Sequence, residues 1–358
     1  MLIVENSTLY RLKGQTRTAE ETFKHVPFIE RASCQVCGKG VNTPVLSWPD
    51  FPMTEIYTKE PVREKRGLLD LDFHLCDSCG HAQLAKVIDP QVQYGNPHSY
   101  HFRASESASG RQSAEFFLNF LNRVIKGQHI PTIVEIGCND LYLLKVLRGR
   151  ADLLIGIDPI LKNANEPAPK IRAMGCFFED AVLERRADLV ICKDTLEHVA
   201  DPGRFLRKII GQSNDDAIFV FQFPLLETLL EGCRFDHIFH QHLNYFSFAS
   251  IERMLQTFGC EVFDYTINDN LWGSVLIAFK KSEGGSVLKK DLRIKSPSEI
   301  HSRFEVFRSQ MDLTRKRLSM FRHDPLYGFG AALMLPLLDY HLQGWLSCLQ
   351  CIIYEDPC

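Results

Sequence analysis

Two short cysteine pairs are the clearest chemical feature of the chain. They are Cys34-Gln-Val-Cys37 and Cys76-Asp-Ser-Cys79, and a glycine follows each pair directly. Two cysteines separated by two residues can direct both sulfurs at one ion, and two such pairs complete a tetrahedral shell. The pattern therefore predicts one bound Zn²⁺, and a structural one, because a closed Cys₄ shell leaves no open coordination position. The alternatives are four unrelated buried thiols or disulfides.

The spacer between the pairs and a third cysteine pair are less specific. Residues 38–75 contain three prolines and an apolar run, so we expect a few short strands there. Cys348 and Cys351 lie in an apolar stretch with no second pair near them. We expect both to be buried as small apolar side chains.

A second chemical pattern follows the cysteine pairs at Thr132-Ile-Val-Glu-Ile-Gly-Cys-Asn-Asp140. Gly137 stands where a strand ends, and a glycine there lets the backbone approach a ligand. The next strand ends at Asp158, a position where an acidic residue commonly holds ribose hydroxyls. No G-x-G-x-x-G fingerprint is present, and Asp140 would repel a pyrophosphate. We therefore expect a nucleoside without phosphate, such as S-adenosyl-L-methionine, and the alternative is an ordinary glycine turn.

Histidines supply groups that can move a proton. His198 follows a strand end in Leu-Glu-His-Val, and three more histidines lie within six positions at 237, 240 and 242. The pKa of a free imidazole, about 6.5, suits acid–base work near neutral pH. The alternatives are a second metal site and histidines hydrogen-bonded within the core. If the segment is extended, His240 and His242 point the same way, and in a helical turn they diverge.

Elements that would position these residues alternate along the central part of the chain. Apolar, strand-like runs are separated by segments with helical apolar spacing, which predicts a largely parallel sheet with helices on both faces. The expected strands lie at 130–136, 153–157, 189–192 and 217–223, with an antiparallel end at 259–266 and 275–280.

We therefore expect four regions: an N-terminal arm, mostly polar and irregular (1–30), a zinc-binding domain (31–95), the cofactor domain (96–285) and a C-terminal part (286–358). The last region starts with a charged helix at 297–321, followed by a strand and glycine loop at 326–332 and a strand at 351–354. We interpret it as a connector helix and a shortened Rossmann-like module with an open sheet edge.

Composition limits the functional classes. The chain has 358 residues and a net charge of −3, so no broad basic surface for nucleic acid is expected. The apolar start is too short for a signal peptide, and no apolar run approaches the length of a membrane span. Twelve cysteines without a secretory signal indicate reduced thiols and metal, and hence a cytoplasmic protein.

These motifs together resemble a known family, the zinc-containing S-adenosylmethionine-dependent C-methyltransferases that act on nucleotide-linked keto-deoxysugars in making antibiotic and polysaccharide sugars. The resemblance spans about Cys34 to Asp356. Seven segments carry it beyond the first cysteine pair: Cys76–Leu84, Tyr100–Ser107, Val134–Asp140, Gly156–Pro159, Leu196–Val199, Phe235–Phe246 and Tyr327–Ala331.

The resemblance implies an α/β protein with three parts: a Cys₄ zinc domain, a class I methyltransferase domain and a partial C-terminal Rossmann-like domain. It implies a sugar nucleotide as substrate, with neither nucleic acid nor membrane as partner, and leaves monomer or dimer open. His242 is the expected base, and His198 and Tyr100 orient substrate or stabilise an enolate. The expected cofactor-binding residues are Glu135, Gly137, Asp158 and Phe178.

The chain departs from the family at four positions. Phe239 and Gln241 replace the Tyr and Glu of Tyr-His-Glu-His, so His242 is expected to lack a carboxylate that would hold its tautomer. Phe102 replaces a Tyr. Leu141 replaces a loop Gly, so we expect the backbone to bend less freely there. Three hypotheses follow: a sugar-nucleotide C-methyltransferase, an O- or N-methyltransferase on a similar sugar, and a non-catalytic partner protein.

Overall fold

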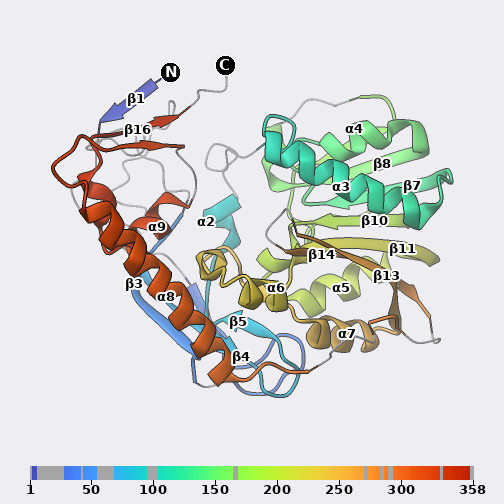
Figure 1. Ribbon diagram of the computed structural model, residues 1–358. Coiled ribbons are helices and arrows are strands. Elements are labelled where there is room, and N and C mark those ends of the chain that lie inside the picture. The colour runs from blue at the N-terminus through green and yellow to red at the C-terminus, as the bar shows by residue number, and fades with distance from the viewer. Residues whose placement is uncertain are drawn as a thin grey trace.

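The structure is a computed structural model of the chain (Figure 1). It describes residues 2–5, 28–41, 43–54, 68–94, 103–163, 168–269, 273–282, 286–288, 293–330 and 334–354. Its largest part is a seven-stranded sheet in the order β13-β14-β11-β10-β7-β8-β9. The strands in chain order are β7 (Ile130–Ile136), β8 (Ala151–Ile157), β9 (Ile171–Met174), β10 (Ala187–Lys193), β11 (Ser213–Pro224), β13 (Cys260–Asn268) and β14 (Ser274–Lys281).

The topology confirms the strands expected from the sequence. Strands β9, β8, β7, β10 and β11 are parallel neighbours, and β14 runs antiparallel to both β11 and β13. The chain winds outward from β7 to one side and then from β10 to the other. A crevice forms at the carboxyl ends of strands where the winding direction changes, and ligands of doubly wound sheets bind there.

Helices cover both faces of this sheet, and alternate strand residues supply the two cores. On one face α3 (Ala108–Ile125) and α4 (Tyr142–Leu147) pack on residues such as Ile133 and Leu189. On the other face α5 (Pro202–Gly211) and α7 (Phe248–Gln256) pack on residues such as Val134 and Val190. Period-two alternation in the strands and the apolar stripes of the helices therefore specify the three-layer fold.

The cysteine-containing region forms a second, smaller sheet in the order β12-β5-β4-β3. It consists of β3 (Leu46–Pro52), β4 (Leu68–Leu75), β5 (Ala82–Leu84) and β12 (Asn244–Tyr245), while β2 (Phe28–Glu30) pairs with β6 (Lys86–Ile88). The short strands expected in the spacer are β3 and β4. Strand β12 comes from the histidine segment, so this sheet joins the cysteine region to the segment that contains His242.

A third core lies between this sheet and the helices that follow. Trp48 of β3 and Phe73 of β4 belong to one apolar cluster with α6 (Leu226–Glu231) and with Phe307 of α8 (Pro297–Ser319). Ser296 caps α8 in a capping box with Glu299. This long helix runs from the small sheet to the C-terminal module (Figure 1).

The C-terminal module is a small three-stranded sheet with short helices beside it. Strand β16 (Cys351–Tyr354) lies between β15 (Tyr327–Phe329), which is parallel, and β1 (Leu2–Glu5), which is antiparallel. The helices are α9 (Leu335–His341) and the 3₁₀ turn η5 (Trp345–Cys348). Residues 2–5 and 28–30 of the predicted irregular arm are therefore strands. Cys351 is buried as expected, whereas Cys348 is exposed because it ends a surface turn, and that prediction is wrong.

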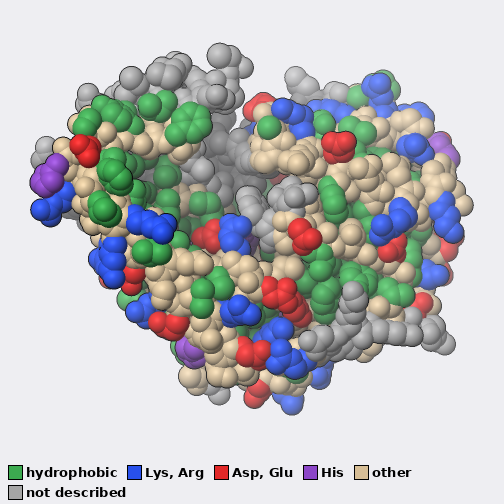
Figure 2. Space-filling model, in the orientation of Figure 1, with side chains coloured by type: hydrophobic (Ala, Val, Ile, Leu, Met, Phe, Trp, Pro, Cys, Tyr) green, Lys and Arg blue, Asp and Glu red, His purple; other side chains and the backbone are tan. Residues whose placement is uncertain are grey.

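The surface of the face shown in Figure 2 mixes acidic and basic side chains along α8, and hydrophobic side chains gather over the C-terminal module. The exposed large hydrophobic residues of that module include Met320, Phe321, Tyr327 and Phe329. Within the described residues, no helix is both long and apolar enough to cross a membrane.

Candidate active site

The four predicted zinc ligands come together beside the turn that joins β4 to β5. The sulfurs of Cys34, Cys37, Cys76 and Cys79 all lie within 4.8 Å of one another. The Cys34–Cys79 and Cys37–Cys76 Sγ pairs are each 3.5 Å apart, close to the roughly 3.8 Å edge of a tetrahedron with Zn–S bonds of about 2.3 Å. The donor set and spacing fit a structural Zn²⁺.

The two cysteine pairs have the same turn. The Gly38 amide donates to the Cys34 carbonyl at 2.9 Å, and the Gly80 amide donates to the Cys76 carbonyl at 2.8 Å. Both glycines have φ of +72°, a conformation that other residues seldom adopt. This explains why a glycine follows each pair.

A cavity of about 350 Å³ opens at the carboxyl ends of β7, β8 and β10 and is bordered by α2 (Pro90–Tyr94). Its volume is in the range of small-molecule binding sites. The wall includes three residues of the expected cofactor site, Gly137, Asp158 and Phe178. It also includes His198, one of the candidate catalytic histidines. Sequence segments more than sixty residues apart therefore meet around one cavity.

Gly137 follows β7 with φ of +71°, and the Thr195 side chain lies close to its Cα. A Cβ built at this position would lie 2.0 Å from the Thr195 Oγ1, so no other residue fits unless Thr195 shifts. The glycine loop is thus needed both for its left-handed turn and for close approach.

Asp158 holds the same loop from the next strand. Its carboxylate accepts hydrogen bonds from the backbone amides of Asn139 at 2.8 Å and Ile160 at 3.0 Å. Burial nevertheless raises the pKa of Asp158 to about 6, against those two hydrogen bonds. A carboxylate oriented by backbone amides on a cavity wall is suited to accept hydrogen bonds from a vicinal diol.

Leu141, which stands where the family motif has a glycine, has a left-handed backbone. Its φ is 65° and its ψ is 21°, so the loop makes this turn without a glycine. That conformation costs a non-glycine residue roughly 1–2 kcal/mol. The side chain is only 3% exposed and packs over Gly156. Burying a leucine contributes about 1.5–3 kcal/mol, which offsets the strain.

The segment before α3 closes over the loop. The Ala104 amide donates to the Asn139 side-chain oxygen at 3.1 Å, and the Ser105 amide donates to Asp140 at 3.0 Å. Ala104 and Ser105 belong to the Tyr100–Ser107 motif. The catalytic candidate of that motif, Tyr100, lies outside the described residues.

The remaining two cofactor candidates differ in position. Phe178 lies on the cavity wall and packs edge-on against Phe205, with ring centroids 5.0 Å apart. Glu135 is buried within β7, away from the cavity lining, and burial raises its pKa well above the ordinary value. Of these two candidates, only Phe178 lies on the cavity wall.

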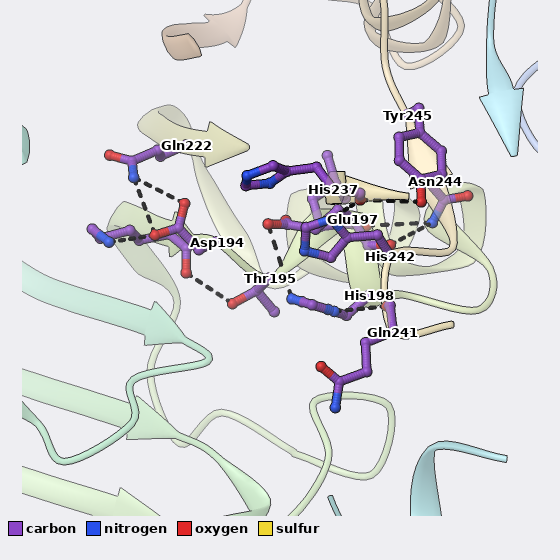
Figure 3. Close-up of polar contacts among 12 residues, drawn as sticks. Asp194, Thr195, Glu197, His198, Gln222, His237, Gln241, His242, Asn244 and Tyr245 are labelled. Carbon is purple, nitrogen blue, oxygen red and sulfur yellow. Dashed lines mark hydrogen bonds and ion pairs between the residues drawn. The ribbon is translucent and has the colours of Figure 1, made fainter. Parts of the chain in front are cut away.

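His198 and His242 form the centre of the histidine site (Figure 3), with ring centroids 5.0 Å apart. The Nδ1–H of His198 donates to the Gln241 carbonyl at 2.7 Å and faces the Tyr94 hydroxyl oxygen at 3.1 Å. The Nδ1–H of His242 donates to the His237 carbonyl at 3.1 Å. These backbone acceptors favour the tautomer with an unprotonated Nε2 on both rings. Desolvation lowers the pKa of both imidazoles, so both are neutral at pH 7.

The other two histidines point elsewhere. His240 sits in a turn, and its Nε2 donates to the Leu69 carbonyl at 3.0 Å. The side chain of His237 contacts Arg234, whose guanidinium lies 2.8 Å from its Nε2. His240 and His242 therefore diverge, and the described residues do not bring the three histidines 237, 240 and 242 to one metal.

The two departures from the family motif have local consequences. The Phe239 ring lies 4.3 Å from the His242 ring, so the position of the missing phenol is filled by apolar packing. The Gln241 side chain points away from the imidazoles (Figure 3). Gln241 supplies no carboxylate to His242, and the His237 carbonyl is the group that holds the His242 tautomer instead.

Glu197 is the site residue that sequence reasoning missed. It precedes His198 in the Leu-Glu-His-Val segment, and that adjacency was the only available indication. Its carboxylate lies 3.9 Å from the His198 Nε2, and donor atoms of Glu197, His198 and His242 lie within 4.8 Å of one another. It is 2% exposed, and burial together with Asp194 raises its pKa well above the ordinary value.

The cysteine region holds the histidine segment in place. Asn244 of β12 pairs with Gln83 of β5, and Gln83 lies four residues after Cys79. The buried Arg31 guanidinium, three residues before Cys34, donates to the Leu243 carbonyl at 3.0 Å and to the Ala200 carbonyl. Its hydrogen bonds therefore join the loop after His198 to the loop after His242.

Comparison with known proteins agrees with this organisation. Residues 99–265 match the family model described as a methyltransferase domain, and residues 34–94 match the model described as a zinc binding domain. With the strand order above, these matches identify the central domain as the class I, S-adenosylmethionine-dependent methyltransferase fold, preceded by a zinc-binding domain.

One curated relative is the C-methyltransferase NovU of Streptomyces niveus, 27% identical over 252 residues. The match covers 68% of this chain and 59% of NovU, so the chain spans less than two thirds of that relative's length.

Among solved structures, the N-methyltransferase NodS of Bradyrhizobium japonicum with S-adenosyl-L-homocysteine is 13% identical, with a TM-score of 0.39. That similarity covers 49% of this chain and 89% of NodS. The plantazolicin methyltransferase BpumL is 14% identical, with a TM-score of 0.39 over 48% of this chain and 82% of BpumL.

Proposed function

We propose that the protein transfers a methyl group from S-adenosyl-L-methionine to a carbon atom of a nucleotide-linked keto-deoxysugar, through an enolate. One observation carries the proposal: the cavity that contains Gly137 and Asp158 also contains His198, with His242 directly behind it. The similarity to the C-methyltransferase NovU and the family motifs around His242 support carbon as the acceptor.

The cofactor end of the cavity would hold the adenosyl group. Asp158 would accept hydrogen bonds from the ribose hydroxyls, the Gly137 loop would allow close approach, and Phe178 would give an apolar wall. When bound, S-adenosyl-L-methionine supplies an electrophilic methyl group.

The histidine end would supply the base. A carbon next to a ketone becomes a nucleophile when it loses a proton, and a neutral imidazole with an unprotonated nitrogen can take that proton. The backbone hydrogen bond on Nδ1 leaves the His242 Nε2 in that state. His198, on the cavity wall, would orient the ketone, and Tyr100 would help to stabilise the enolate oxygen.

An O- or N-methyltransferase is the second candidate, and one geometric observation favours it. His242 is 9% exposed and is not among the residues of the cavity wall, whereas His198 is. Methylation of a hydroxyl needs only a base beside that hydroxyl, and His198 alone could act in this way.

Product analysis separates the two candidates. The purified protein is incubated with S-adenosyl-L-methionine carrying a ¹³C-methyl group and with a panel of keto-sugar nucleotides. The proposal predicts a new methyl group attached to carbon, identified by its coupling in NMR. A methyl group on oxygen or nitrogen would favour the second candidate, and no transfer to any member of the panel would contradict the proposed substrate class.

A further inference from the structure

The groups around Glu197 form a second cluster of metal-ligand type, separate from the four cysteines. One donor atom each from Glu197, His198 and His242 lies within 4.8 Å of the other two. Two imidazoles and one carboxylate are a common ligand set for divalent transition metals. The two adjacent residues follow β10, and the third comes from the loop before β12.

Both imidazoles are oriented as metal ligands usually are. A ligating histidine almost always donates its other ring N–H to a carbonyl or carboxylate, which fixes the ring and its tautomer. His198 does this with the Gln241 carbonyl, and His242 does it with the His237 carbonyl. Each ring therefore keeps its Nε2 lone pair for another partner, and the His198 Nε2 is 3.9 Å from the Glu197 carboxylate.

The carboxyl group of Glu197 lacks part of its hydrogen bonding. Glu197 is 2% exposed, and its Oε2 is buried without a hydrogen-bond partner among the described residues. A buried carboxylate oxygen without a partner costs free energy, and paired charges or bound metals are the usual remedy. An imidazole lone pair could accept a hydrogen bond from a protonated Glu197, but the His198 Nε2 lies 3.9 Å from the carboxyl group, which is too long for that bond. A cation between the three groups would satisfy all of them.

We propose that Glu197, His198 and His242 form a binding site for one divalent transition-metal ion, in addition to the Cys₄ zinc site. Nitrogen and oxygen donors of this kind suit Zn²⁺, Co²⁺, Ni²⁺ or Fe²⁺ rather than Ca²⁺. Three protein ligands leave at least one position open, unlike the closed shell of the four cysteines.

This site has a consequence for catalysis that rests on the proposed function. The metal would occupy the same Nε2 lone pair that His242 needs as a base, so metal binding and proton abstraction would exclude each other. The metal site itself depends only on the geometry of the three side chains. Its binding test therefore succeeds or fails whatever reaction the protein catalyses.

Cobalt titration of the full chain tests the site directly. Protein freed of metal is titrated with Co²⁺ under reducing conditions, and bound cobalt is counted after gel filtration. The first site gives intense thiolate-to-cobalt charge-transfer absorption, because its ligands are cysteines. The proposal predicts a second equivalent that adds only weak ligand-field bands, typical of nitrogen and oxygen donors.

Matched variants assign the second equivalent. Glu197→Gln and His242→Gln keep side-chain size and should lose the second equivalent while keeping the thiolate bands, which also shows that they fold. His240→Ala is the control, because His240 donates to the Leu69 carbonyl and should leave two equivalents. A wild-type chain that binds one equivalent, or a second equivalent that persists in both Gln variants, would overturn the proposal.

Discussion

The two ends of the candidate active site are built in different ways. The cofactor end consists of neighbouring strand ends, a glycine turn and one carboxylate held by backbone amides. The histidine end consists of side chains on two loops, oriented by backbone carbonyls and linked to the cysteine region through Arg31 and β12. The groups that hold the cofactor loop therefore come mainly from the large sheet, whereas the histidine end is also held by the zinc-binding domain.

This difference suggests that cofactor binding and proton transfer can be lost separately. The four predictions below test that separation, in order of decreasing effect.

Replacement of His242 should have the largest effect. We expect His242→Ala to lower kcat by about 10²–10⁴, the usual contribution of a general base. Affinity for S-adenosyl-L-methionine should hardly change, because His242 is not on the wall of the cofactor cavity. Steady-state kinetics gives kcat, and calorimetry with the same preparation gives the affinity for S-adenosyl-L-methionine.

His240→Ala is the matched control, because that ring is two residues away and donates to the Leu69 carbonyl. Its kcat should stay near that of the wild type. Wild-type kcat in His242→Ala would place the base elsewhere, with His198 next.

Loss of zinc should affect the histidine end more than the cofactor end. We expect Cys76→Ser to lower the melting temperature, because metal binding energy is folding energy in small metal-stabilised modules. Turnover should fall further than cofactor affinity, since Arg31 and β5 no longer hold the loops beside His198 and His242. Equal losses of turnover and cofactor affinity would show that the two ends are not separable.

Replacement of Asp158 should affect the cofactor end alone. Asp158→Ala should weaken S-adenosyl-L-methionine binding by roughly tenfold or more, because a hydrogen bond to a charged group contributes about 1.5–3 kcal/mol. Circular dichroism checks that the fold is intact. Unchanged affinity by calorimetry would mean that other groups hold the ribose.

Cofactor affinity should also depend on pH. The pKa of Asp158 is raised to about 6, so the carboxylate is ionised above pH 6 and protonated below it. If only the ionised form accepts both ribose hydroxyls, the affinity is constant at higher pH and falls as the pH drops through 6. The expected loss is about fourfold near pH 5.5. Asp158→Asn should remove the pH dependence, and a wild-type affinity that is flat from pH 7 to 5 would contradict this role.

Local sequence patterns predicted the strands, the cysteine cluster and the meeting of Gly137 and Asp158 at neighbouring strand ends. The alternation of apolar runs predicted the sheet, and an apolar run followed directly by a glycine predicted the turn after β7. The sheet and this turn can be predicted from the pattern of residues close together in the chain.

Long-range packing decided the features that the sequence did not predict. Leu141 keeps a left-handed backbone because its side chain is buried over Gly156, a contact from the next strand. Gln241 turns its side chain away, and its carbonyl instead orients His198. Glu197 gains its position only when the loop after β10 meets the loop before β12. None of these contacts has a local pattern.

Hydrogen–deuterium exchange in the substrate tests the central claim, enolate formation by the histidine end, most directly. The protein is incubated in D₂O with a keto-sugar nucleotide and S-adenosyl-L-homocysteine, which has no methyl group to transfer. The account predicts exchange of the proton next to the ketone in the wild type and in His240→Ala, and its loss in His242→Ala. Absence of exchange in a wild-type protein that does methylate the same sugar would contradict it.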